Sequence, residues 1–154
     1  IQSHYCGQWF SLILQKKMKK IRKFKLKSYS RSSGKLIPIN FDKKFPIKVK
    51  RIFFINGKKN KIRGEHAHKK CSQFFIPIQG KMALIIETPN SKKSIILSGF
   101  SKTAILVPPR YWCSIKFLEK NSTLMVACDK YYNAYDYLES FEEYKEYLRK
   151  KWKF

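Results

Sequence analysis

Residues 63–80 read Arg-Gly-Glu-His66-Ala-His68-Lys-Lys-Cys-Ser-Gln73-Phe-Phe-Ile-Pro-Ile-Gln-Gly80, and this segment is the most informative part of the sequence. Side chains alternate between the two faces of a β-strand, so His66 and His68 project from the same face and share one pocket. The apolar run at residues 74–78 predicts a return strand, reached through a polar turn at residues 69–72. The pattern is typical of a site in the wall of a β-barrel.

The spacing of His66, His68, Gln73 and Gly80 resembles the first motif of the cupins, which usually carry a glutamate at the Gln73 position. Cupins are jelly-roll barrels made of two β-sheets, and their open mouth holds a ligand or a metal. The resemblance therefore implies an all-β fold, a cupin jelly-roll β-barrel.

The chain also resembles a narrower group, the sugar-nucleotide 3,4-ketoisomerase family. This resemblance rests on residues 63–69, on Gln73 and on the preceding strand with Arg51. Further matching segments are Pro108-Pro-x-x-Trp112, Leu124-Met-Val-Ala127, Tyr131 and Asp136-Tyr-Leu138. Members of that family act on dTDP-4-keto-6-deoxyglucose. The resemblance implies an isomerase in the synthesis of dTDP-3-amino sugars, for lipopolysaccharide or another surface glycan.

The chain of 154 residues is long enough to bury one core, whereas two domains would each be marginal. A hydrophobic content of 44% argues against disorder. We expect a single cupin domain at residues 18–154. Met18 begins a segment that resembles an ordinary bacterial start, so residues 1–17 are interpreted as a possible N-terminal extension, in which His4 has no assigned role.

Apolar residues change their period near the C-terminus. Side chains from Tyr137 to Leu148 recur at intervals of three and four, which predicts a C-terminal α-helix over residues 136–151 with its aromatic face packed on the barrel. Upstream, the patterns predict a turn at residues 31–34, a strand closed by Asn56-Gly57, and a hairpin around Pro89-Asn90.

The net charge of +24 raises nucleic-acid binding as a possible function. The lysines are spread along the whole chain, however, and no recognition helix, zinc-finger spacing or RNA-binding aromatic signature is present. We expect no nucleic-acid partner, and expect the charge to steer a nucleotide diphosphate toward the surface.

The four cysteines, Cys6, Cys71, Cys113 and Cys128, show no Cys-x-x-Cys spacing. No secretory signal is recognisable, so free thiols and a cytoplasmic location are expected. The apolar stretch at residues 9–14 is far shorter than the roughly 20 residues that span a bilayer. We therefore expect no membrane partner.

Two histidines in one pocket suit proton transfer. A hydrogen on the carbon next to a ketone is acidic because its carbanion delocalises as an enolate, and a histidine of near-neutral pKa can remove it. Following the family, His66 is the expected catalytic base and His68 its partner. The second histidine, or a neighbouring tyrosine or arginine, would stabilise the oxyanion.

The substrate is expected to contact five residues. Arg51 and Arg63 suit the diphosphate and the sugar, because a guanidinium binds phosphate oxygens in a bidentate manner. Gln73 could donate a hydrogen bond to the sugar, and Tyr131 lies where the family contributes a tyrosine. Cys113 stands where the family has a histidine or arginine associated with the C4 configuration of the product.

The same residues could also be considered as ligands of a metal ion. His66, His68 and Gln73 could supply three ligands, but Gln is a weak neutral ligand, and Cys113 stands where a metal-binding cupin has its fourth histidine. A mixed His/Cys zinc site remains chemically possible. The resemblance implies a metal-free reaction, so we expect no metal and no cofactor.

Two alternative functions remain open. A C3/C5 epimerase shares the first half-reaction, but the His–Asp pair typical of that class cannot be identified in the sequence. A non-catalytic cupin would bind the sugar nucleotide without exchanging hydrogen.

Phe53 and Phe54 stand where the ketoisomerases commonly have tyrosine. The resemblance also implies a homodimer, because pairing of subunits protects the sheet edges; the gluco or galacto configuration of the product stays open.

Overall fold

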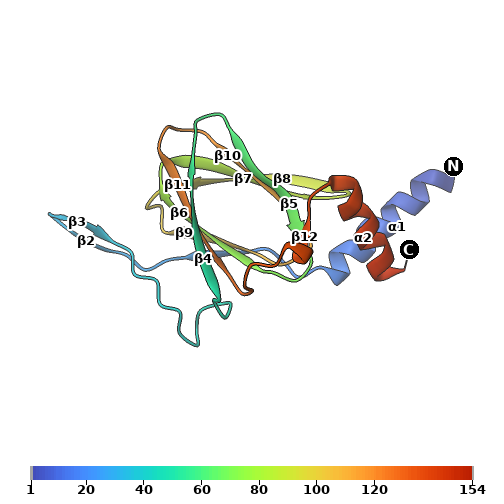
Figure 1. Ribbon diagram of the computed structural model, residues 1–154, viewed down its shortest axis with the longest axis horizontal. Coiled ribbons are helices and arrows are strands. Elements are labelled where there is room, and N and C mark those ends of the chain that lie inside the picture. Colours follow the sequence, from blue (N-terminus) through green and yellow to red (C-terminus); the bar gives the residue numbers. More distant parts are fainter. Residues whose placement is uncertain (1, 154) are drawn as a thin grey trace.

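Two antiparallel five-stranded β-sheets form the centre of the computed structural model, which describes residues 2–153 without the side chains of residues 2–7 and 10 (Figure 1). The first sheet contains, in spatial order, β1 (Arg22–Lys25), β9 (Thr103–Val107), β6 (Gln73–Gln79), β11 (Ser122–Cys128) and β4 (Arg51–Gly57). The second contains β12 (Tyr137–Leu138), β5 (Ile62–His68), β10 (Trp112–Phe117), β7 (Lys81–Thr88) and β8 (Ser91–Ser98). This confirms the predicted all-β, two-sheet architecture, and in the described residues no hydrogen-bonded ladder joins the two sheets into one closed barrel.

The main core lies between the two sheets, because each sheet presents an apolar face to the other. Phe75 and Val126 of the first sheet pack in one cluster with Leu84 and Phe117 of the second, and each of the four is at most 2% exposed. Burial of such side chains stabilises the fold by about 1.5–3 kcal/mol each. The alternation of apolar residues therefore sets which face of each strand points inward.

The stretch at residues 63–80 passes from one sheet to the other. β5 pairs with β10 and β12, whereas β6 pairs with β9 and β11, so β6 is not the hydrogen-bonded neighbour that a return strand would be. The connecting turn is held by two carboxylates. The backbone N–H of Lys70 donates to Asp136 Oδ1 at 2.8 Å, and that of Ser72 donates to Asp129 Oδ1 at 2.8 Å. These long-range hydrogen bonds hold the turn through which the chain passes from the second sheet to the first.

Gly57 lies inside β4 rather than in the predicted turn after it. A Cβ atom at Gly57 would lie 2.1 Å from the ring of Phe117. The glycine is therefore required by close packing of this strand on the core. Two other predicted turns are confirmed: the hairpin of β7 and β8 encloses Pro89-Asn90, and β2 (Tyr29–Arg31) pairs with β3 (Gly34–Leu36).

The C-terminal helix α2 (Phe141–Trp152) begins later than predicted. The Ser140 hydroxyl caps it by accepting a hydrogen bond from the Glu143 N–H at 3.1 Å. The preceding residues instead form the short 3-10 helix η1 (Ala134–Asp136) and β12. Tyr144 and Leu148 are fully buried against the second sheet, which confirms that the aromatic face of the helix packs on the strands.

Helix α1 (Gln2–Lys17) lies beside α2 at the end of the molecule that holds both chain termini (Figure 1). Leu14 and Met18 join the cluster formed by α2. The interpretation of residues 1–17 as an extension of a single domain stays a prediction. No helix of the described part of the chain is long and apolar enough to cross a membrane.

The cysteine thiols that the structure describes, those of Cys71, Cys113 and Cys128, are all free, as the spacing predicted. The side chains of His4 and Cys6 lie outside the described residues. The ribbon of β2 and β3 projects from the end of the molecule opposite the helices (Figure 1).

Candidate active site

A cavity of about 440 Å³ opens between the sheets, with walls from strands of both. Five of the seven predicted site residues line it: Arg51, Arg63, His66, Gln73 and Cys113. Two predicted residues, His68 and Tyr131, do not line it. The fold therefore gathers most of the predicted site, from β4, β5, β6 and β10, around one hollow.

A bulge in β5 aims His66 into this cavity. Arg63 and His66 are three residues apart, so a regular strand would place them on opposite faces. Gly64 and Glu65 both have positive φ, 90° and 58°, and the register with β10 shifts at this point. The extra residue of such a bulge reorients the strand, which brings both side chains to the cavity. A Cβ at Gly64 would lie 2.9 Å from the Cys113 carbonyl oxygen.

Burial keeps His66 neutral. The pKa of its imidazole is lowered from the ordinary value because burial disfavours the charged form, while contacts with the Gly64 backbone and with Glu139 oppose this effect in part. A neutral imidazole has a free lone pair that can accept a proton. His66 therefore enters the cavity in the form that a general base needs.

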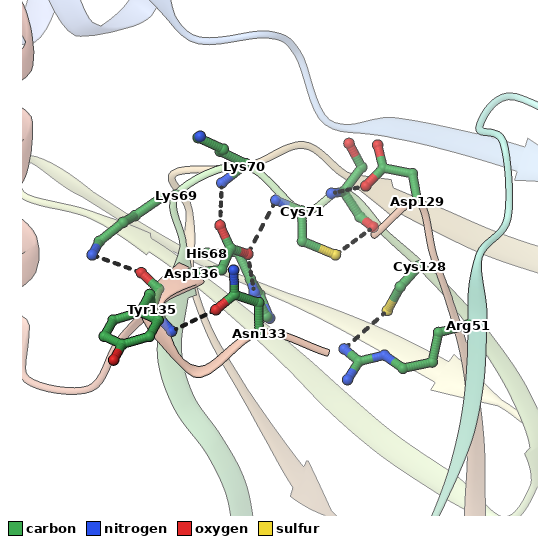
Figure 2. Close-up of polar contacts among 11 residues, drawn as sticks. Arg51, His68, Lys69, Lys70, Cys71, Cys128, Asp129, Asn133, Tyr135 and Asp136 are labelled. Carbon is green, nitrogen blue, oxygen red and sulfur yellow. Dashed lines mark hydrogen bonds and ion pairs between the residues drawn. The ribbon is translucent and has the colours of Figure 1, made fainter. Parts of the chain in front are cut away.

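His68 has a different environment, because it is 4% exposed and binds a carboxylate. Its Nδ1 lies 2.9 Å from Asp136 Oδ2. The Asp136 carboxylate also accepts hydrogen bonds from the backbone N–H groups of Lys70 and Cys71 (Figure 2). Burial lowers the pKa of His68, and the hydrogen bond to Asp136 opposes that shift. This is the kind of His–Asp pair that the sequence did not reveal.

The pair fixes the tautomer of His68. An ionised carboxylate only accepts hydrogen bonds, so Nδ1 carries the proton and Nε2 is left as an acceptor. Nε2 is buried and has no hydrogen-bond partner among the described residues. Such an orphaned nitrogen makes His68 a candidate for contact with a ligand or with an ordered water.

Tyr137 packs against both histidines and was absent from the predicted site. Its ring centroid is 5.0 Å from that of His66 and 4.4 Å from that of His68, and the residue lines the cavity. On β12 it stands opposite His68 in the register of β5. The sequence carried one signal for it, because residues 136–138 were among the segments that matched the family.

Arg51 contacts both Tyr137 and Cys128, which belongs to β11 of the first sheet. Burial lowers the pKa of the guanidinium, but hydrogen bonds to the Tyr137 hydroxyl and to Cys128 raise it by more. The bond to Cys128 Sγ measures 3.9 Å from Nη2. Arg63, by contrast, is exposed at its place on the rim. One predicted arginine is therefore held inside the cavity, and the other is free to reach a ligand outside it.

Tyr131 is 71% exposed, and its ring lies 5.7 Å from the Lys50 ammonium. A role in substrate binding stays a prediction for this residue. Cys113 is the cavity residue that faces His66 in the register of β10 with β5. Burial raises the pKa of its thiol to about 12, so the thiol is protonated and neutral at physiological pH.

One group of side chains resembles a metal site in composition. The ligand atoms of His68, Cys71 and Asp136 lie within 4.8 Å of one another. The hydrogen bonds described above already occupy Nδ1 of the histidine and both carboxylate oxygens. A hydrogen bond to Cys128 raises the pKa of the Cys71 thiol, together with burial, whereas a metal takes the thiolate. These three side chains therefore suit a hydrogen-bonded support for His68 better than a metal site.

A family model described as FdtA: WxcM-like, C-terminal, matches residues 16–149. The chain belongs to this family. Among curated proteins, a TDP-4-oxo-6-deoxy-alpha-D-glucose-3,4-oxoisomerase of Aneurinibacillus thermoaerophilus is 29% identical over 120 residues, which are 77% of this chain and 86% of the relative.

Solved structures agree with this membership of the FdtA, WxcM-like family. The 3,4-ketoisomerase QdtA of Thermoanaerobacterium thermosaccharolyticum, in complex with TDP, superposes with a TM-score of 0.80 at 25% identity, over 87% of this chain and 98% of that one. An RmlC 3,5-epimerase of Legionella pneumophila superposes with a TM-score of 0.68 at 16% identity, over 79% of this chain and 73% of that one. The epimerase therefore shares the fold alone.

Proposed function

We propose that this chain is a sugar-nucleotide 3,4-ketoisomerase that converts dTDP-4-keto-6-deoxyglucose into a dTDP-3-keto-6-deoxyhexose. One observation carries the proposal: His66, with a lowered pKa, points into a cavity that Arg51 and Arg63 also line. The relatives named above support it, since the curated protein is a 3,4-oxoisomerase and the QdtA crystal contains TDP.

The chemistry follows from a neutral base beside cationic groups. His66 removes the proton from C3 of the 4-keto sugar, and the electrons of the C–H bond form a double bond between C3 and C4 while the carbonyl electrons move to O4. The result is an enediolate. O4 then gains a proton and O3 loses one as the carbonyl forms at C3, and return of a proton to C4 completes the isomerisation. Positive charge from Arg51 stabilises the intermediate at O4.

The remaining residues position the substrate. Gln73 is 6% exposed and donates a hydrogen bond to the sugar from the cavity wall. Arg63 at the rim binds the diphosphate, because its planar guanidinium matches phosphate oxygens. His68, whose Nδ1 is held by Asp136 and whose ring contacts Tyr137, is the proposed second catalytic histidine.

Hydrogen exchange distinguishes this proposal from its alternatives. The protein is mixed with dTDP-4-keto-6-deoxyglucose in deuterium oxide, and the sugar is followed by NMR. A ketoisomerase forms the 3-keto product and adds deuterium at C3 or C4. An epimerase would place deuterium at C3 and C5 and retain the 4-ketone. A binding protein would shift resonances without any exchange, and that outcome would reject catalysis.

The reaction is proposed to need no metal and no cofactor. The hydrogen bonds around Asp136 support this, since they already occupy its carboxylate oxygens and Nδ1 of His68, which a cation would otherwise bind. Prolonged chelation followed by desalting should leave the turnover unchanged. Loss of activity that a single divalent ion restores would show the metal-free proposal to be wrong.

A homodimer is the proposed assembly. Strand β4 is an unpaired sheet edge, and its side chains Ile52 and Phe54 are 41% and 64% exposed. Tyr29 and Leu36 on the projecting ribbon are similarly exposed, at 59% and 62%. Apolar side chains on an edge favour pairing with a second copy. Light scattering should give twice the 18.4 kDa of the chain, and a monomer at all concentrations would contradict the proposal.

The cellular context follows from the proposed substrate. A nucleotide-linked 3-keto sugar is the substrate of an aminotransferase, so we place the enzyme in the cytoplasm, before assembly of lipopolysaccharide or another surface glycan. Its partners in this proposal are a dTDP-linked 4-keto-6-deoxy sugar and a second copy of the chain, with neither a nucleic acid nor a membrane.

A further inference from the structure

The cavity has one phenolic hydroxyl among the described residues that line it, and that hydroxyl belongs to Tyr137. Apart from His66, the other aromatic side chains of the lining are Phe53, Phe54 and Phe75, which carry no polar atom. The Tyr137 ring lies 5.0 Å from the ring of His66. A ligand that gives a proton to His66 is therefore also within reach of Tyr137.

Arg51 sets the direction of hydrogen bonding at this hydroxyl. A guanidinium has donors and no acceptor, so the Tyr137 oxygen accepts the hydrogen bond from Arg51. The hydrogen of the phenol is then left to donate elsewhere. Arg51 is itself held in place, since its Nη2 donates to Cys128 and its guanidinium lies 5.3 Å from the centre of the Phe53 ring.

The isomerisation needs a group of this kind. The base His66 accounts for the protons on carbon, but the reaction also removes a proton from O3 and places one on O4. These oxygens sit on adjacent carbons, so one hydroxyl in contact with both can exchange the two protons. Nε2 of His68 carries no hydrogen to donate, and His68 does not line the cavity, which leaves Tyr137 as the hydroxyl beside the base among the described lining residues.

We infer that Tyr137 is a catalytic residue that moves the proton between the two oxygens of the sugar, an assignment that rests on the proposed 3,4-ketoisomerase function. When His66 takes the C3 proton, the C4 carbonyl electrons move to O4, and O4 takes the phenolic proton. The phenolate then takes the proton from O3. The carbonyl forms at C3, and C4 takes a proton from the imidazolium of His66. The phenol and the imidazole are both restored.

The test is Tyr137→Phe, measured with dTDP-4-keto-6-deoxyglucose in deuterium oxide. Two rates are followed by NMR: entry of deuterium at C3 of the recovered substrate, and formation of the 3-keto product. We expect product formation to fall by about 10²-fold or more, because a general acid–base group is lost. Removal of the C3 proton by His66 is expected to fall less, so the ratio of exchange to isomerisation rises.

Tyr135→Phe is the matched control, because Tyr135 is 86% exposed and lies outside the cavity lining. It should leave both rates unchanged. Titration with TDP, the nucleotide alone, checks that Tyr137→Phe remains folded and retains its binding site.

Three outcomes would overturn the assignment. A Tyr137→Phe variant that isomerises within a few-fold of the wild type would show that the hydroxyl takes no part. Equal losses in exchange and isomerisation would leave Tyr137 as a hydrogen-bond donor that moves no proton between oxygens. A wild-type protein that neither exchanges nor isomerises the sugar would refute the proposed function itself, and the assignment with it.

Discussion

The C-terminal half of β5 carries the same residue at two positions, in different environments. His66, beside the bulge at Gly64, opens into the cavity, and its pKa is set mainly by burial. His68, two residues later, is almost fully enclosed and is bound to Asp136. A shared strand face therefore does not imply a shared role. The first histidine lines the cavity, whereas the second is held by the hydrogen bonds around Asp136, and the proposed mechanism gives each of them a different part.

Replacement of His66 should have the largest effect on catalysis. His66→Asn removes the base with little change in size, so we expect turnover to fall by about 10²–10⁴-fold. The melting temperature should change little, because the imidazole makes no buried ion pair. Steady-state assays and thermal unfolding on the same sample measure both effects. Near-normal turnover would remove His66 from the mechanism and would reverse the comparison between the two histidines.

Replacement of Asp136 should mainly reduce stability. Asp136→Asn removes a charged acceptor of hydrogen bonds from His68, Lys70 and Cys71, and we expect a loss of about 2–3 kcal/mol in the free energy of unfolding. Denaturant unfolding measures this loss. Asp42→Asn is the control, because it removes the same charge from an exposed loop. Equal stability of the two variants would contradict a supporting role for the pair.

The pH dependence tests the shared feature of the histidines. Both pKa values are lowered from the ordinary 6.5, so the unfolded chain binds more protons than the folded chain between the folded pKa values and 6.5. The two histidines therefore make their full contribution to the free energy of unfolding above pH 6.5, and this contribution decreases as the pH falls through this window. The acid limb of kcat/KM should likewise lie below pH 6.5. An acid limb above that value would contradict a neutral His66 base.

Replacement of Cys113 should have the smallest effect on rate. Its neutral thiol is a weak donor and faces His66 across the strands, so it controls the face of protonation at C4 poorly. We expect Cys113→His and Cys113→Arg to change the epimer ratio more than the total turnover. Trapping the product with a 3-aminotransferase and analysing the C4 configuration by NMR decides the point. An identical single epimer from all three proteins would exclude Cys113 from this role.

Local sequence patterns predicted much of the fold and part of the site. The alternation along β7 and β8 and the His-x-His spacing are properties of neighbouring residues, so they could be recognised directly. The Asp136 partner of His68 could not, since 68 residues separate the two. Its place depends on which strands pair, and a pairing of distant strands leaves no local pattern.

Two other differences also come from interactions beyond local periodicity. Apolar spacing extended the predicted C-terminal helix back to residue 136, but pairing of Tyr137 with His68 makes that segment a strand, and Ser140 caps the helix after it. The bulge at Gly64 was also hidden, because it appears as a register shift against β10, where the Cys113 carbonyl leaves little room for a side chain at Gly64. The motif thus identified the residues of β5 without giving their orientation.

Strand β12 pairs with β5 but is synthesised much later than β5. His68 is synthesised long before Asp136 and Tyr137, which reach it only after all the intervening strands have left the ribosome. Until then the turn after β5 lacks the carboxylate that binds its backbone. A growing chain therefore contains His66 and His68 before the residues that surround them, so the candidate site is complete only after β12 has been made.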